Sequence, residues 1–252
     1  LSENRSVTIK IGILRADDVS PELALDFGQY PQMVEDLIVA ANRARGAAAK
    51  AVEFTSYAVN RLQYPSNIDE VDAYIITGSK SSVYDPEPWI EELSHFVERL
   101  HNGKKKTVGI CFGHQIIASA LGGKVEKAAV GWGLGVKPTS LTDAATGAEP
   151  YLPQGDSSIN LLYSHQDQVT VPAPGSTLLA TTDICPVAMT AIGEHILSFQ
   201  GHPEFSHDYA QALYRLREKN YPPEAYKNAM ASLQEQEHGA LVANWIIDFI
   251  SS

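Results

Sequence analysis

A five-residue segment, Gly109-Ile110-Cys111-Phe112-Gly113, constrains the fold of this chain more than any other feature. A strand-prone apolar run, Thr107–Ile110, leads into it, and small-residue helical sequence follows at once. A strand, a tight turn and a helix around a nucleophile are typical of a nucleophile elbow. The turn strains the central residue, and side chains at either glycine would collide with the neighbouring strand and helix. The segment therefore predicts a cysteine at a helix N-terminus, where a thiolate is favoured over a thiol.

The apolar periodicity along the first half of the chain predicts an α/β fold. Candidate strands over Thr8–Leu14, Lys50–Tyr57 and Val71–Thr77 alternate with candidate helices. One helix is expected over Pro31–Arg45, and another should begin at Asp85-Pro86, with Asp85 as its N-cap and Pro86 in its first turn. This alternation is typical of βαβ units, so we expect a mostly parallel central sheet flanked by helices.

After Gly122-Gly123 the pattern changes, which predicts a small antiparallel excursion followed by a helical tail. Short strand-prone runs lie between glycine and proline turns: Gly133–Pro138, Ile159–Tyr163, Gln168–Val171, Thr177–Thr181, Val187–Ile192 and His195–Phe199. No internal repeat or clear linker interrupts the chain. We therefore expect a single domain over residues 1–252, with a core over about 9–205 and a helical C-terminal extension over 206–252.

Charge and cysteine content narrow the possible partners. The chain has 30 acidic and 19 basic residues and a formal net charge of −11, which argues against a nucleic-acid or anionic-membrane partner. No apolar run approaches the roughly 18 residues of a membrane span, and a signal-peptide pattern is lacking. The two cysteines, Cys111 and Cys185, offer neither a disulfide framework nor a CxxC metal site. We expect no metal and a reducing, cytoplasmic setting.

A nucleophilic cysteine needs a base and a group that orients the base. His202 and Glu204 lie two residues apart after the strand-prone run that ends at Phe199. Alternate residues of an extended chain point the same way, so the carboxylate can hold the imidazole while its other nitrogen faces the thiol. The spacing therefore makes Cys111, His202 and Glu204 a candidate catalytic triad. Its order along the chain differs from that of the α/β-hydrolases.

Three segments together resemble the class I glutamine amidotransferases, and especially the glutaminase domain of GMP synthase and its stand-alone relatives. They are Ile110-Cys111-Phe112-Gly113-His114-Gln115, Gly201-His202-Pro203-Glu204 and Tyr163-Ser164-His165-Gln166-Asp167-Gln168-Val169. The likeness covers roughly Ile9 to Phe205 and implies a flavodoxin-like class I glutaminase fold without a cofactor. It implies that Cys111 attacks the γ-carboxamide of glutamine or of a γ-glutamyl compound and forms a γ-glutamyl thioester. His202 would protonate the leaving amine and later activate water, and Glu204 would orient His202.

The resemblance also implies residues that bind the oxyanion and the substrate. The backbone N–H groups of Phe112 and Ser79 would stabilise the tetrahedral oxyanion. In the loop that supplies the second of these donors, after the third predicted strand, the family usually carries Gly-Gly-Pro. This chain has Gly78-Ser79-Lys80 there and matches only the first glycine. Further residues resemble the wall that grips the α-amino and α-carboxyl groups of the glutamyl substrate: Gly78, Gln115, Ser164, His165, Gln166 and Asp167.

The sequence leaves several alternatives open. The residues contain neither a P-loop nor a Ser-Gly-Gly-x-Asp-Ser pyrophosphatase loop, so a synthetase partner would have to be a separate subunit. Without such a partner, the chain would be a stand-alone γ-glutamyl peptidase or transferase acting on a small-molecule substrate. A non-catalytic or redox-sensing relative would keep Cys111 without needing His202 and Glu204, and a cysteine-elbow α/β-hydrolase would act on esters. His114 and His165 are alternative candidates for the base.

Overall fold

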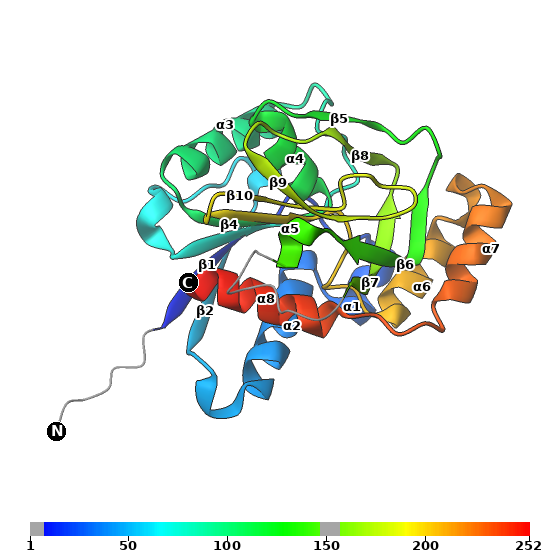
Figure 1. Ribbon diagram of the computed structural model, residues 1–252, viewed down its shortest axis with the longest axis horizontal. Helices are drawn as coiled ribbons and strands as arrows, with labels where there is room; N and C mark the ends of the chain where they lie inside the picture. The colour runs from blue at the N-terminus through cyan, green and yellow to red at the C-terminus, as the bar shows by residue number, and fades with distance from the viewer. Residues whose placement is uncertain (1–7, 147–156) are drawn as a thin grey trace.

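A nine-stranded sheet runs through the part of the chain that this computed structural model describes, residues 8–146 and 157–252 (Figure 1). Its strand order is β2-β1-β3-β4-β11-β10-β9-β6-β7. The parallel half contains β1 (Ile9–Leu14), β2 (Val52–Tyr57), β3 (Ala73–Ile76), β4 (Lys106–Ile110) and β11 (Ile196–Phe199). The antiparallel half contains β6 (Gly133–Leu141), β7 (Ser158–His165), β9 (Ser176–Thr181) and β10 (Met189–Ile192).

The predicted α/β class is confirmed, and the predicted antiparallel excursion forms one half of a mixed sheet. The excursion continues the main sheet, and a separate two-stranded sheet joins β5 (Lys124–Lys127) to β8 (Asp167–Val171). The run His195–Phe199, expected within the antiparallel excursion, forms β11, which pairs antiparallel with β10 and in parallel with β4. Its place beside β4 brings the segment that follows it next to Cys111.

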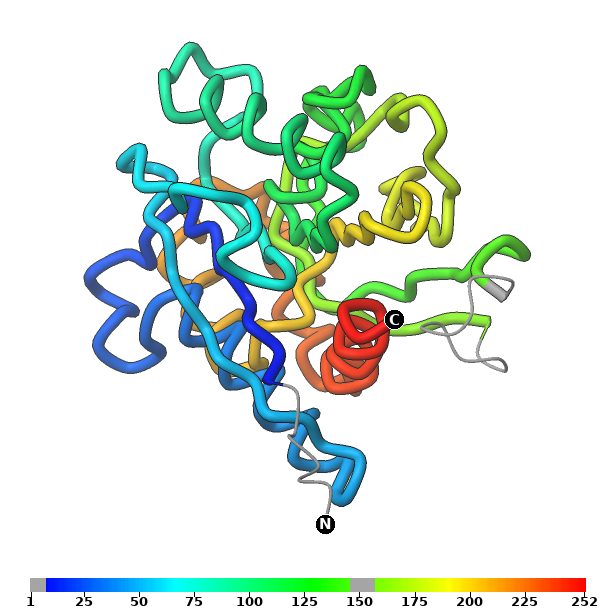
Figure 2. The backbone as a smooth tube through the Cα atoms, turned by 90° about the vertical axis from the view of Figure 1, so that its left-hand side faces the viewer, coloured from blue at the N-terminus to red at the C-terminus, as the bar shows by residue number. Residues whose placement is uncertain are grey.

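Helices cover both faces of the sheet (Figures 1 and 2). Those described are α1 (Pro21–Phe27), α2 (Tyr30–Ala44), α3 (Pro88–Asn102), α4 (Phe112–Ala120), α5 (Asp143–Thr146), α6 (His207–Leu216), α7 (Pro223–Ser232) and α8 (Gly239–Ser251). Successive residues of β3 point to opposite faces, as pleated strands require. Ile75 joins the core under α2 and α8, whereas Tyr74 and Ile76 join the core under α3 and α4.

The beginning of α3 differs from the sequence prediction. The helix starts at Pro88 with Glu87 as N-cap, and Pro88 rather than Pro86 occupies its first turn. Asp85 does not cap it, because its carboxylate accepts the N–H of Ser82 at 2.8 Å and closes the preceding turn. Local propensity located the helix, but a competing turn decided where it begins.

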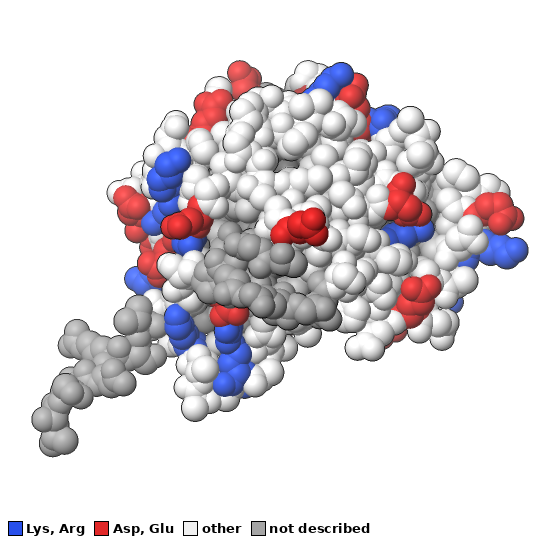
Figure 3. Space-filling view, in the orientation of Figure 1, with Lys and Arg blue, Asp and Glu red and all other residues white. Residues whose placement is uncertain are grey.

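The helical tail predicted after Ser206 is confirmed by α6, α7 and α8. Helix α8 packs against α2 and the sheet and buries Trp245 and Phe249 almost completely. None of the described helices is long and apolar enough to cross a bilayer. On the face in Figure 3, the described acidic and basic side chains are interspersed, so the excess negative charge is not gathered into one patch there.

Candidate active site

Cys111 lies at the turn between β4 and α4 in a strained backbone conformation. Its φ is 52° and its ψ is −102°, a region that residues with a side chain rarely adopt. Such strain costs on the order of 1–3 kcal/mol and persists only when the surroundings impose it. Two hydrogen bonds impose it here: the Cys111 N–H donates to Phe199 O at 2.8 Å, and the Gln115 N–H donates to Cys111 O at 3.0 Å.

The glycines on either side of Cys111 are required by close backbone contacts. A Cβ atom at Gly109 would lie 2.6 Å from the carbonyl oxygen of Gly113, and one at Gly113 would lie 2.4 Å from that of Ile76 in β3. Real Cβ atoms essentially never approach backbone this closely. The expected collisions with the neighbouring strand and helix are therefore confirmed, and the elbow tolerates no side chain at either position.

The structure brings Cys111, His202 and Glu204 together. His202 Nδ1 lies 2.8 Å from Glu204 Oε1, and the His202 side chain also hydrogen-bonds to Cys111. The segment is anchored by the His202 N–H, which donates to Leu162 O at 2.7 Å, and by Phe205, whose ring stacks on the imidazole at 3.9 Å. Because the carboxylate occupies Nδ1, the other ring nitrogen is the one available to the thiol.

The electrostatics of the site favour a charged imidazole. Burial alone would lower the pKa of His202, but the negative charges of Glu204 and Cys111 outweigh it and raise the pKa to about 10. Cys111 Sγ also accepts a hydrogen bond from Gln200 Nε2 at 3.5 Å. The donors around the sulfur can stabilise negative charge on it when it acts as a nucleophile.

The two other histidines considered as bases have different surroundings. His114 is fully enclosed, with Nδ1 2.7 Å from Ser198 Oγ and Nε2 3.0 Å from Val187 O. His165 Nδ1 lies 3.0 Å from Asp167 O. Burial lowers the pKa of both imidazoles to about 4, so both are neutral at pH 7. His114 is a core residue, and His165 lines the cavity wall without a carboxylate to orient it.

The loop after β3 lies against the reactive pair. A Cβ atom at Gly78 would lie 3.1 Å from His202 Cε1 and 3.7 Å from Cys111 Cβ. The Ser79 N–H makes no hydrogen bond with the described part of the chain. Phe112 opens α4, where a helix leaves its first N–H groups without an intrahelical partner. The two N–H groups expected to bind an oxyanion thus belong to segments on either side of Cys111.

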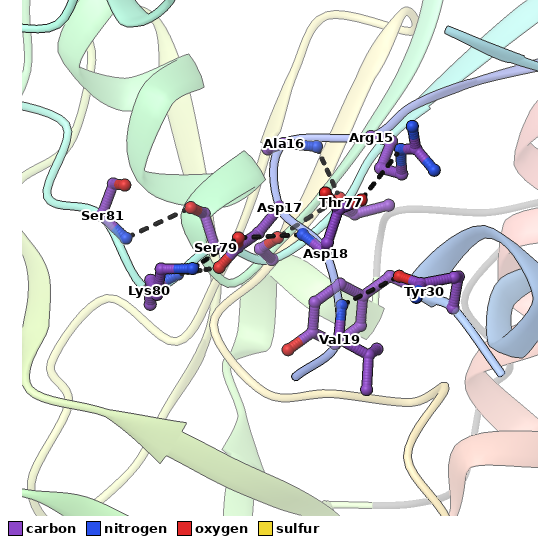
Figure 4. Close-up of polar contacts among 12 residues, drawn as sticks. Arg15, Ala16, Asp17, Asp18, Val19, Tyr30, Thr77, Ser79, Lys80 and Ser81 are labelled. Carbon is purple, nitrogen blue, oxygen red and sulfur yellow. Dashed lines mark hydrogen bonds and ion pairs between the residues drawn. The ribbon is translucent and has the colours of Figure 1, made fainter. Parts of the chain in front are cut away.

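A buried carboxylate binds the backbone of this loop (Figure 4). Asp17, in the connection between β1 and α1, is 7% exposed. Its Oδ2 accepts the Lys80 N–H at 3.0 Å, and its Oδ1 lies 3.0 Å from Lys80 Nζ. Oδ1 also accepts the Asp18 N–H at 2.8 Å. No local pattern in the sequence indicates this role of Asp17, because its contact with Lys80 joins positions 63 residues apart.

A cavity of about 350 Å³ opens beside Cys111. Its wall includes the predicted Ser79, Gln115, Ser164, His165, Gln166 and Asp167, and Gly78 lies in an adjoining hollow with His202. Seven other residues that no sequence motif indicated also line it: Lys80, Ser81, Ser82, Lys127, Trp132, Arg217 and Asn220. They come from several elements, and the two last follow α6 in the predicted C-terminal extension.

Two of the predicted wall residues also hold the wall together. Gln115 Nε2 donates to Asp167 O at 2.7 Å and to Gln200 Oε1 at 3.1 Å. The Asp167 carboxylate accepts hydrogen bonds from the hydroxyls of Ser82 and Tyr84. Over residues 8–146 and 157–252, no group of three or more His, Cys, Asp or Glu side chains is arranged to hold a metal ion.

The sequence model of the family described as "Glutamine amidotransferase class-I" matches residues 23–216, most of the chain. The chain therefore belongs to the class I glutamine amidotransferase family. A putative glutamine amidotransferase-like protein of Schizosaccharomyces pombe is 33% identical over 212 residues, which cover 82% of this chain and 83% of the relative.

Two further likenesses are to a curated plant protein and to a solved structure. Gamma-glutamyl peptidase 5 of Arabidopsis thaliana is 37% identical over 141 residues, so the chain spans 56% of the length of that relative. The crystal structure of a glutamine amidotransferase from Thermotoga maritima superposes with a TM-score of 0.74, covering 97% of this chain and 99% of the other. Their sequence identity is 15%, and this likeness shows the shared fold.

Proposed function

We propose that this chain hydrolyses the γ-amide bond of γ-glutamyl compounds through a thioester on Cys111. The observation that carries the proposal is the buried, hydrogen-bonded arrangement of Cys111, His202 and Glu204 at a strained elbow that opens into a cavity. Family membership and the named γ-glutamyl peptidase among the relatives support the same chemistry. A redox-sensing protein would need the thiol but not the carboxylate-held imidazole.

The first half of the reaction transfers the γ-glutamyl group to sulfur. The Cys111 thiolate attacks the γ-carbonyl carbon, and the carbonyl electron pair moves onto oxygen, where the Phe112 and Ser79 N–H groups stabilise it. The C–N bond then breaks as the carbonyl re-forms. The leaving nitrogen takes its proton from the His202 imidazolium and departs as ammonia or an amine, which leaves a γ-glutamyl thioester and a neutral imidazole.

The second half returns the enzyme to its starting state. Neutral His202 takes a proton from a water molecule, and the resulting oxygen nucleophile attacks the thioester carbon. The C–S bond breaks, free glutamate leaves, and the thiolate–imidazolium pair is restored. Glu204 holds the imidazole in one orientation through both halves.

The charges of the cavity favour a substrate whose leaving group is anionic. Arg217 and Lys127 line it, and neither forms an ion pair within the described residues, although the chain carries a net charge of −11. Arg217 also lines the hollow that contains His202. Because His202 gives its proton to the leaving nitrogen, we place Arg217 on the leaving-group side. We therefore favour a γ-glutamyl amino acid or peptide, whose leaving amine carries a carboxylate, over glutamine itself.

A matched pair of substrates tests this preference. The protein alone should release glutamate from γ-glutamyl-glycine with a higher kcat/KM than from γ-glutamyl-methylamide, which lacks the carboxylate. Arg217→Gln should lower kcat/KM for γ-glutamyl-glycine by about 10- to 100-fold, since a hydrogen bond to a charged group contributes about 1.5–3 kcal/mol. The same variant should keep kcat/KM for γ-glutamyl-methylamide within about twofold of the wild-type value.

Arg215→Gln is the control, because Arg215 is an exposed residue in the last turn of α6, two positions before Arg217, and lies outside the cavity lining. If Arg217→Gln lowered kcat/KM equally for both substrates, a leaving-group role for Arg217 would be contradicted. An ammonia-supplying subunit, the second candidate, would turn over neither substrate until a separate synthetase was added.

A further inference from the structure

We infer that Asp17 is a positioning residue for oxyanion stabilisation, which acts by fixing the peptide groups around Ser79. The inference rests on the proposed thioester mechanism, because the Ser79 N–H is one of its two oxyanion donors. Asp17 itself lines neither the cavity nor the hollow that contains His202. Its carboxylate instead binds the residue that follows Ser79, as Figure 4 shows.

The Gly78-Ser79 segment is anchored at both ends to the connection between β1 and α1. On one side, the Thr77 N–H donates to Leu14 O at 3.1 Å, and Thr77 Oγ1 accepts the Ala16 N–H at 3.0 Å. On the other side, Asp17 Oδ2 accepts the Lys80 N–H at 3.0 Å. Gly78 and Ser79 therefore connect two anchored residues, Thr77 and Lys80. The direction of the Ser79 N–H depends on both of these anchors.

Such a second anchor is needed because position 78 is a glycine in a tight place. The 3.1 Å approach to His202 leaves little room for a side chain there. Glycine has the widest backbone freedom of any residue, so a loop that contains it is not held by its own sterics. A donor displaced by about 1 Å loses much of its effect on the transition state. The Asp17 hydrogen bond supplies the restraint that glycine does not.

The surroundings of Asp17 fit this role. Burying a carboxylate is costly unless donors surround it, and Asp17 accepts from the backbone N–H groups of Asp18 and Lys80 as well as from Lys80 Nζ. The Lys80 side chain is 68% exposed, so its ion pair with Asp17 is screened by water and contributes little. The backbone contact is therefore the one that positions the loop.

The experiment compares Asp17→Ala with Asp18→Ala. Asp18 is the next residue, but its carboxylate pairs with Arg15 and Arg61 instead of the loop. With γ-glutamyl-p-nitroanilide, Asp17→Ala should lower kcat by about 10- to 100-fold and change KM by less than about threefold, because oxyanion donors act mainly on the transition state. Asp18→Ala should keep kcat within about twofold. Asp17→Asn keeps the shape and an acceptor oxygen, so it should recover most of the loss.

Two further measurements separate positioning from general damage. Alkylation of Cys111 by iodoacetamide displaces iodide without forming an oxyanion, so its rate should stay within about twofold in Asp17→Ala. Amide hydrogen exchange over residues 77–82 should become faster in Asp17→Ala and remain unchanged in Asp18→Ala. If Asp17→Ala fails to fold, hydrogen exchange and kcat are compared between Asp17→Asn and the wild-type protein instead.

Three outcomes would overturn the inference: an unchanged kcat in folded Asp17→Ala, a parallel fall in kcat and alkylation rate, or unchanged exchange of the loop. Exchange does not depend on turnover. If the wild-type protein cleaved no γ-glutamyl amide, the proposed function would fail, whereas the exchange rates would still decide whether Asp17 holds the loop.

Discussion

Cys111→Ala should lower kcat for every γ-glutamyl substrate by at least about 10⁴-fold, because no other group of the site can form the thioester. The measurement is steady-state release of glutamate, with circular dichroism to verify folding. Alanine removes only the sulfur from a buried position, so the fold should persist.

Cys185→Ala is the matched control, because Cys185 is also buried but far less reactive. Burial raises the pKa of its thiol to about 12, and its Sγ–H donates to Val187 O at 3.4 Å. The control should retain activity within about threefold. Hydrolysis by Cys111→Ala at more than about a tenth of the wild-type rate would contradict the thioester mechanism.

Glu204→Gln should lower kcat at pH 7 by about 10²- to 10³-fold, since the amide neither holds the imidazole in one tautomer nor stabilises its charge. The variant should also change the pH profile. In the wild-type protein, activity should fall on the alkaline side as His202 loses its proton, near the raised pKa of about 10. Without the Glu204 charge, the burial that lowers the pKa of His202 is less opposed, so this limb should move to lower pH.

The same pair links pH to stability. The pKa of His202 in the folded protein lies above its ordinary value of 6.5, so the pair stabilises the fold fully below pH 6.5 and loses that contribution as the pH rises toward 10. The free energy of unfolding of wild type and Glu204→Gln should therefore converge between pH 6.5 and 10. An alkaline limb that stayed in place in Glu204→Gln would contradict the assigned role of Glu204.

Local sequence patterns predicted the elements that position the chemistry. The Gly-x-Cys-x-Gly segment predicted the elbow, because a strained turn with no room for side chains leaves few choices at positions 109 and 113. The spacing of His202 and Glu204 predicted that they would lie together, and they do, at 2.8 Å. Their catalytic roles and the division of the chain at residue 205 stay predictions.

Contacts between distant segments could not be predicted in the same way. The pairing of β11 with β4 depends on the arrangement of the whole sheet, so the residue pattern within His195–Phe199 alone does not predict it. Asp17 stands in an unremarkable loop, and its importance follows from a contact with Lys80 across 63 positions. Arg217 follows α6, which returns over the sheet, and only that return brings it to the cavity.

Labelling with a glutamine-mimicking diazo ketone tests the central claim most directly. Such a compound occupies the substrate site and alkylates the attacking atom, so one equivalent should attach to the protein as the activity disappears. Peptide mass spectrometry should place the added mass on Cys111, with Cys185 unmodified and with no labelling of Cys111→Ala. Stoichiometric loss of activity with the label on Cys185, or on any residue other than Cys111, would contradict the account.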